Sequence, residues 1–134
     1  KGDIDCYHIS YWANNASGGM RGTCNLRKNS GFFCVANGKD PMVKGLDYSD
    51  EEFEFNKYRI RLIKQDERIR FYIDDQLVID FIDQRFNNIF NPDGTFLKAN
   101  VDTGKVHDGG KVALRQMAGL KAEYSNFKVY KILK

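Results

Sequence analysis

The segment 20–28 (MRGTCNLRK) carries polar side chains at every second position. In a β-strand these side chains share one face, and the small or apolar residues between them share the other. The polar face would carry Arg21, Thr23, Asn25 and Arg27. Such a face can hold an oxygen-rich anion, because arginine binds carboxylates and sulfates through paired hydrogen bonds. A strand with a solvated face shows the same alternation, so both interpretations stay open at this point.

The preceding segment 4–12 (IDCYHISYW) is rich in aromatic and β-branched residues and predicts another strand. Its core face would carry Tyr7, Ile9 and Tyr11. Its other face, shared with the polar side chains of segment 20–28, would carry His8, Ser10 and Trp12. A shift of one residue in register would exchange the two faces.

The chain has the composition of one globular domain. Its 134 residues are 42% hydrophobic and carry a net charge of +3 from 21 basic and 18 acidic residues. This balance argues against a nucleic-acid-binding protein, which usually shows a basic stripe. No apolar run approaches the length that spans a membrane. We therefore expect neither nucleic acid nor a membrane as a partner.

The three cysteines, Cys6, Cys24 and Cys34, cannot all pair, and none shows the spacing of zinc ligands. No metal and no cofactor is therefore predicted. Cys24 and Cys34 flank a predicted turn, so a disulfide across a hairpin is one interpretation. Small buried thiols are the favoured one.

The rest of the chain predicts an all-β, antiparallel β-sandwich, because short alternating segments are separated by polar turns and no helical period is present. Further strands are expected over residues 32–36, 57–66, 68–73, 77–82, 111–117 and 120–133. Their core side chains would include Tyr58, Ile60, Leu62, Phe127 and Val129, with Lys64 facing outward. Residues 85–110 are expected to form a long irregular loop, often a functional feature in compact domains, with His107 at the surface.

Residues 47–54 contain five carboxylates. A glycosidase needs two carboxylates at a defined separation. Here the carboxylates lie in a run with the composition of a solvated loop, so a catalytic pair is the weaker interpretation.

Several segments resemble known β-sandwich proteins. Residues 68–81 (RIRFYIDDQLVIDF) resemble the hairpin of concanavalin-A-like jelly rolls, and residues 121–132 (KAEYSNFKVYKI) resemble their closing strand. The combination of YHISYW, RGTCNLRK, GFFCVANGKDP and VALRQMAGLKAEYSNFKVY resembles the YesU-like family over nearly the whole chain. This resemblance implies a galectin-like jelly roll and a bacterial protein, periplasmic or cytoplasmic, associated with the use of rhamnogalacturonan-type polysaccharides.

The chain also departs from the pattern of that family. Family members are longer at the amino end, so the resemblance implies that residues 1–134 form one domain that is the C-terminal portion of a longer jelly roll. A missing N-terminal segment or a second copy of the chain would then protect an exposed sheet edge. Residues 86–108 are longer than the family pattern, so no lid function is implied there. Residues 21–27 resemble the RTELR-type strand in the groove of alginate-lyase jelly rolls, with Asn25 in place of glutamate.

The leading hypothesis is β-elimination on an acidic oligosaccharide, as in a polysaccharide lyase or a sugar dehydratase. Arg27, with Asn25 or Gln116, would neutralise a uronate carboxylate and stabilise the charge that develops there. His8 would remove the C5 proton, and Tyr11 or Tyr7 would protonate the departing oxygen if the register of segment 4–12 were reversed. The expected substrate-binding residues are Ser10, Trp12, Arg21, Thr23, Asn25, Arg115 and Gln116.

Two other functions also fit the sequence. A non-catalytic glycan-binding module needs only an aromatic platform, such as Trp12 or Tyr11, and a few polar anchors. Hydrolysis of oxidised glycosides would need an acid and a base, and no convincing pair is present outside residues 47–54. That function ranks last.

Overall fold

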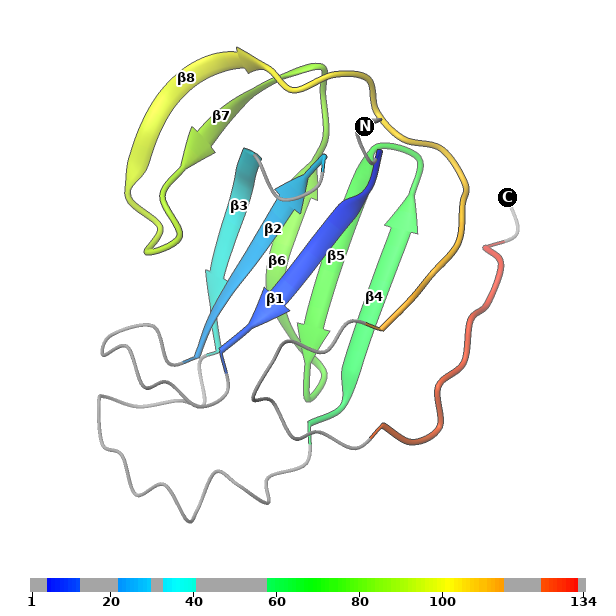
Figure 1. Ribbon diagram of the computed structural model, residues 1–134. Coiled ribbons are helices and arrows are strands. Elements are labelled where there is room, and N and C mark those ends of the chain that lie inside the picture. Colours follow the sequence, from blue (N-terminus) through cyan, green and yellow to red (C-terminus); the bar gives the residue numbers. More distant parts are fainter. Residues whose placement is uncertain (1–4, 13–21, 30–32, 41–57, 115–123, 133–134) are drawn as a thin grey trace.

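A computed structural model describes residues 5–12, 22–29, 33–40, 58–114 and 124–132. Two three-stranded antiparallel sheets pack face to face (Figure 1). The first sheet contains β1 (Tyr7–Tyr11), β2 (Thr23–Lys28) and β3 (Phe33–Lys39). The second sheet contains β4 (Ile60–Gln65), β5 (Arg68–Ile73) and β6 (Gln76–Ile82). A two-stranded hairpin of β7 (Phe86–Phe90) and β8 (Phe96–Asp102) completes the described elements, and the predicted antiparallel β-sandwich is confirmed.

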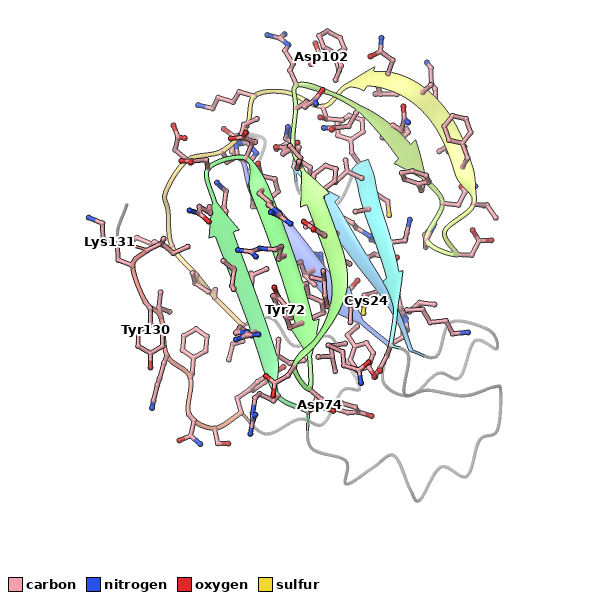
Figure 2. All side chains as sticks on the ribbon, turned by 180° about the vertical axis from the view of Figure 1, so that it is seen from behind. Cys24, Tyr72, Asp74, Asp102, Tyr130 and Lys131 are labelled. Carbon is pink, nitrogen blue, oxygen red and sulfur yellow. The ribbon has the colours of Figure 1, made fainter. Side chains whose placement is uncertain are left out.

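The core lies between the two sheets and is built from alternate residues of their facing strands. Its buried members are Cys24, Leu26, Val35, Ile69, Phe71, Ile73 and Ile79. Full burial of a Leu, Ile or Phe side chain stabilises a fold by about 1.5–3 kcal/mol. Figure 2 shows the second sheet from its outer side, with Cys24 behind it. The described part of the chain has no helix that is long and apolar enough to cross a membrane.

The register between β1 and β2 decides which face of β1 looks into the core. His8 lies opposite Arg27, and Ser10 lies opposite Asn25. The intervening residues Tyr7, Ile9 and Tyr11 pack against the core. The predicted faces of segments 4–12 and 20–28 are therefore confirmed in the described residues.

The predicted orientation of β4 needs one correction. Lys64 lies opposite Ile69 of β5, so it shares the core-facing side with Ile60 and Leu62 rather than facing outward. Its ammonium lies 5.8 Å from the centre of the Tyr7 ring. Ile60 and Leu62 are each 50% exposed, because no described strand of the first sheet covers β4.

The prediction of an irregular loop over residues 85–110 is wrong for most of its length. Residues 86–102 form the β7–β8 hairpin, whose turn is closed by hydrogen bonds from Asn91 N to Thr95 O at 2.8 Å and from Gly94 N to Asn91 O at 2.9 Å. Asp93 Oδ1 also accepts from Thr95 N at 2.9 Å. The sequence does not reveal β7 and β8, because this segment is rich in asparagine and asparagine is depleted in strands.

The two strands expected near the C-terminus are absent from the described residues 111–114 and 124–132. Phe127 and Val129, expected in the core, are 54% and 64% exposed. Tyr130 and Lys131 lie on this segment, beside the second sheet (Figure 2). Alternation alone does not make a strand, because a strand also needs a neighbour that accepts its backbone hydrogen bonds. The rest of both predicted strands lies outside the described residues.

Candidate functional site

Four polar side chains that the sequence singled out lie together on the outer face of the first sheet, away from the core. We call them the polar row: His8, Ser10, Asn25 and Arg27. The antiparallel pairing of β1 with β2 places His8 against Arg27 and Ser10 against Asn25. The row is rigid, because its residues belong to paired strands whose other faces are buried in the core.

Two atoms of the polar row are enclosed without a hydrogen-bond partner. Within the described part of the chain these are Ser10 Oγ and Arg27 Nε. They belong to neighbouring strands, and one residue pair, Ile9 with Leu26, separates their positions along the ladder. Buried polar atoms in native proteins are nearly always hydrogen-bonded, so each exception indicates an unmet partner such as a ligand or a water.

Asn25 is fully buried and has a full set of partners. With its amide oriented to satisfy both ends, Nδ2 donates to Pro92 O at 3.1 Å, to Cys24 O at 3.0 Å and to Oδ1 of Asn37. Pro92 belongs to the turn of the β7–β8 hairpin, so the tip of the hairpin covers this end of the row. Asn25 therefore holds the hairpin in place, which differs from its predicted role as a substrate ligand.

Tyr11, the predicted acid, lies on the opposite face of β1 from His8 and Arg27. Its hydroxyl donates to Asp40 Oδ2 at 2.7 Å, and its ring packs edge-on against Tyr58 with centroids 5.2 Å apart. Burial and then the hydrogen bond to Asp40 raise the pKa of Tyr11 far above its usual range. Tyr11 is a core residue in this register.

The other predicted binding residues lie at the end of the row or outside the described residues. Trp12 and Thr23 extend the ladder, with Trp12 N donating to Thr23 O at 3.0 Å, and both side chains are partly buried. The structure does not describe Arg21, Arg115 and Gln116.

The cysteines behave as buried thiols rather than as a disulfide. Cys24 and Cys34 are free and buried, on opposite faces of the first sheet. Burial raises the pKa of Cys24 to about 12. It also raises the pKa of Cys34, although Arg27 and Asn37 oppose that shift.

A buried ion pair that the sequence did not reveal holds one end of the sandwich. Lys28 Nζ lies 3.0 Å from Asp83 Oδ2, and both side chains are completely enclosed. The ammonium also donates to Gly104 O at 2.8 Å and to Thr103 Oγ1 at 3.3 Å. Buried charges persist only when they are paired and hydrogen-bonded. Lys28 ends an alternating strand, so the sequence offers no signal that separates it from a surface lysine.

The Asp83 carboxylate accepts hydrogen bonds from two further donors in the same cluster. Asn87 Nδ2 donates to Asp83 Oδ1 at 2.9 Å, and the Tyr7 hydroxyl donates to Oδ2. Burial and the hydrogen bond to Asp83 raise the pKa of Tyr7 above its usual range. The cluster joins β1 and β2 to the segments that flank the β7–β8 hairpin at residues 83–87 and 103–104.

His107, expected at the surface, is partly buried and contacts the polar cluster. Its Nε2 lies 2.7 Å from Asn29 Oδ1, and its backbone N donates to the Tyr7 hydroxyl at 3.1 Å. The imidazole packs edge-on against the Tyr7 ring with centroids 5.0 Å apart. Burial lowers the pKa of His107, and the nearby Lys28 ammonium lowers it further.

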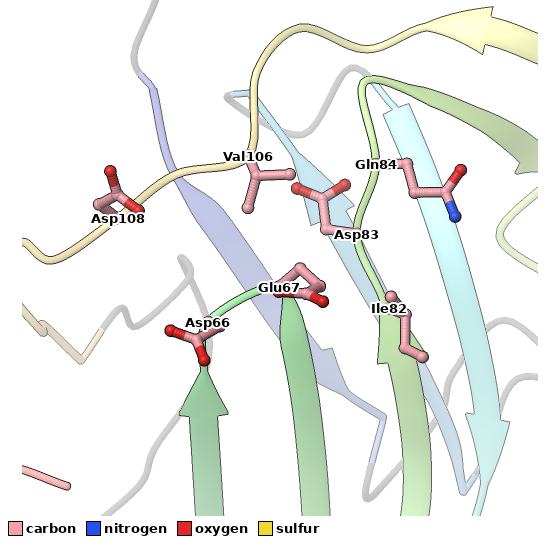
Figure 3. Close-up of a pocket in the computed structure, with 7 residues that line it drawn as sticks. All are labelled: Asp66, Glu67, Ile82, Asp83, Gln84, Val106 and Asp108. Atoms are coloured by element: carbon pink, nitrogen blue, oxygen red, sulfur yellow. The ribbon is translucent and has the colours of Figure 1, made fainter. Parts of the chain in front are cut away.

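A shallow pocket of about 420 Å³ opens beside this cluster (Figure 3). Its lining includes the carboxylates of Asp66, Glu67, Asp83 and Asp108. No group of three or more His, Cys, Asp or Glu side chains in the described part of the chain is arranged to hold a metal ion. The carboxylate of Asp83 is already committed to Lys28.

Comparisons with known proteins place the chain in a family. Over its 134 residues the chain is 32% identical to a curated protein described as "Uncharacterized protein YesU" from Bacillus subtilis (strain 168). The match covers 99% of this chain and 51% of the relative, so the chain spans about half the length of that protein. No solved structure matches the chain significantly. The family model described as "Domain of unknown function (DUF1961)" matches residues 1–129, and the chain therefore belongs to the DUF1961 family, as the resemblance to YesU predicted.

Proposed function

We propose that the polar row binds a carboxylate-bearing sugar and that the chain acts on acidic oligosaccharides by β-elimination. The observation that carries this proposal is the pair of enclosed, unpartnered atoms, Ser10 Oγ and Arg27 Nε. An enclosed polar atom without a hydrogen bond costs about 1–3 kcal/mol. Because both atoms lie below the surface, oxygen atoms of a bound sugar would remove that cost only once the neighbouring side chains move aside. A guanidinium also pairs with a carboxylate more strongly where water is excluded.

The cross-strand geometry brings a base next to the anion-binding group. Side chains directly opposite each other on antiparallel strands have Cβ atoms roughly 4.5–5.5 Å apart. His8 and Arg27 form such a pair. The imidazole and the guanidinium therefore reach the same sugar residue of a ligand.

Elimination needs the uronate carboxylate neutralised and the C5 proton removed. In the proposal, Arg27 pairs with the carboxylate and stabilises the negative charge that develops on it when the C5 proton leaves. His8 takes that proton, the electron pair forms the C4=C5 double bond, and the bond from C4 to its oxygen breaks. Tyr11 lies on the core face, so we assign it no part. The protonated His8 returns the proton to the departing oxygen.

The architecture supports a carbohydrate substrate. Jelly-roll proteins are double-sheet folds of this kind, and they include lectin domains. We propose that the chain is part of a YesU-like jelly roll that serves the use of rhamnogalacturonan-type polysaccharides. Ile60 and Leu62 are half-exposed on the core side of β4, which supports completion of the sandwich by a further segment or a second copy.

A non-catalytic glycan-binding module is the second candidate. The observation in its favour is the position of Tyr11, which leaves the polar row without the separate acid that the sequence suggested. Binding needs only the hydrogen bonds of Ser10 and Arg27, and both functions predict the same ligand class.

The test combines binding with product detection. The protein is mixed with uronate oligosaccharides from pectin, ulvan and alginate, and the ultraviolet absorbance of the unsaturated product is followed beside calorimetric binding. His8→Ala should lower the elimination rate by about 10²–10⁴-fold, the usual loss when a general base is removed. Arg27→Ala should weaken binding by roughly 10–150-fold, since a hydrogen bond to a charged group contributes about 1.5–3 kcal/mol.

Arg59→Ala is the matched control, because Arg59 is an exposed arginine paired with Asp75 away from the polar row. Binding and rate should both be unchanged in that variant. Binding without any unsaturated product would assign the chain to the glycan-binding class. Full elimination activity in a folded His8→Ala protein would refute the catalytic assignment.

A further inference from the structure

We propose that a groove between the β7–β8 hairpin and the edge of the second sheet binds a neutral oligosaccharide. We call it the hairpin groove. Its volume is about 440 Å³, within the range of roughly 300–1,000 Å³ that is typical of ligand sites. None of the described residues that line it belongs to the polar row, so this site does not depend on the proposed function.

The groove exists because the two layers of the sandwich end at different places along this edge. β7 lies beside β3 and beside no described strand of the second sheet, so the hairpin extends the first layer (Figure 1). β6 is the last described strand of the second sheet on this side. Val35 of β3, which is buried in the core, lines the groove together with Phe81 and Ile82 of β6. One face of the hairpin is therefore left open to a ligand.

Phenylalanine side chains supply the apolar surface of the groove. They are Phe81 of β6 and Phe86 and Phe90 of β7. Phe86 is 49% exposed, and Phe90 packs edge-on against Phe96 with ring centroids 6.1 Å apart. The face of an aromatic ring carries partial negative charge and attracts the positive hydrogens of C–H groups. A sugar ring presents such C–H groups on one of its faces, so the exposed ring of Phe86 can serve as a platform for it.

Side-chain amides supply hydrogen-bonding groups beside this apolar surface. Asn88 Oδ1 accepts from Asn100 N at 3.1 Å, where Asn100 has a φ of 55° at the register shift between β7 and β8. This left-handed conformation is uncommon for a residue other than glycine, and such positions are concentrated at ligand sites. Among the described residues, the side-chain amides of Gln84 and Asn100 form no hydrogen bond within the protein. Both amides can therefore pair with the hydroxyl groups of a ligand.

Charge selects a neutral occupant. None of the described side chains that line the groove is ionisable, although 29% of the residues in the chain are charged. Ile82 and Gln84 also line the neighbouring pocket with its four carboxylates, and Gln84 extends away from Asp83 (Figure 3). Those carboxylates would repel a uronate or a phosphate. The ligand that fits is uncharged and has both hydroxyl groups and C–H faces, as a neutral oligosaccharide does.

The experiment is a calorimetric titration of the whole chain with neutral tetrasaccharides derived from galactan, xylan and glucan. At least one of them should bind, and its affinity should be the same in Arg27→Ala, which separates this site from the polar row. No binding to any of these tetrasaccharides would overturn the inference and leave the proposed function intact. Adenosine is the comparison ligand, because it is neutral and also stacks on aromatic rings. Tighter binding of adenosine than of every tetrasaccharide would overturn the assignment to a sugar.

Two variants test whether the sugar binds in the hairpin groove. Phe86→Ala should weaken binding roughly three- to tenfold, because about half of the ring surface is open for a ligand to cover. Asn100→Gly removes the amide and keeps the backbone conformation, because glycine adopts a positive φ freely, and it should weaken binding roughly two- to tenfold. The matched control is Phe127→Ala, because Phe127 is 54% exposed and lies outside the groove; its affinity should be unchanged. Unchanged affinity in either groove variant, with an unchanged melting temperature, would overturn the placement of the site.

Discussion

Replacing the buried Lys28 by methionine should destabilise the fold more than any surface charge replacement. Methionine keeps an unbranched side chain of similar length but removes the ammonium. The Asp83 carboxylate would then stay enclosed with the Asn87 amide and the Tyr7 hydroxyl as its remaining donors. The backbone oxygen of Gly104, 2.8 Å from the ammonium, would lose its donor.

The expected loss of stability follows from the complete burial of both Lys28 and Asp83. Removing one partner of a buried pair costs about 3–5 kcal/mol, because the other charge is left uncompensated. The total stability of a domain is about 5–15 kcal/mol, so this change removes a third or more of it in a typical case. Lys28→Met with Asp83→Asn should recover most of the loss, because no charge remains buried.

The assay is urea unfolding at neutral pH, followed by circular dichroism for both single variants and the double variant. The control is Arg68→Met, which breaks the exposed pair with Asp80 and should barely move the urea midpoint, because water screens exposed charges. A loss below about 1 kcal/mol for Lys28→Met would refute the reasoning. Equally damaging would be a double variant whose loss equals the sum of the two single losses.

Three further predictions follow from the described contacts. Cys24 and Cys34 should resist alkylation in the folded protein at mildly alkaline pH and react fully after denaturation, because burial raises both pKa values; rapid native labelling of either thiol would contradict this. The lowered pKa of His107 means that the unfolded chain binds a proton more readily, so stability should fall as the pH drops below about 6.5. That fall should be smaller in His107→Gln, and an identical pH dependence in the two proteins would count against it. Gly38→Ala should lower the free energy of unfolding by about 1–3 kcal/mol in the same urea assay, because its methyl group would collide with the backbone oxygen of Val78, and an unchanged midpoint would disprove the close approach.

The faces of β1 and β2 could be predicted because they depend on local pattern. Alternation with a period of two residues assigns side chains to faces wherever one face is buried. Thus His8 and Arg27 were placed on one face from the sequence, and the structure pairs them. The predicted orientation of Lys64 was wrong because its place in the alternation, rather than its charge, determines its face; its ammonium lies near the Tyr7 ring on the core side.

The β7–β8 hairpin could not be predicted from the same pattern. Residues 86–102 contain four asparagines and a Pro-Asp-Gly turn, which are typical of loops. The hairpin is stabilised from outside, by Asn25 at its tip and by Lys28 at its base. Both partners are more than 50 residues distant in the chain.

The sequence by itself determined the all-β class, the family and the face of the first sheet that carries the polar row, because alternation and motif are local properties of the chain. Only the tertiary structure decided which polar side chains are already paired within the protein. In the folded chain Asn25 bonds to the hairpin, Tyr11 packs in the core and Lys28 pairs with Asp83. Ser10 and Arg27 each keep one enclosed atom without a partner among the described residues. The physical reason is that hydrogen bonds and ion pairs depend on distances between distant segments, which the order of residues does not contain.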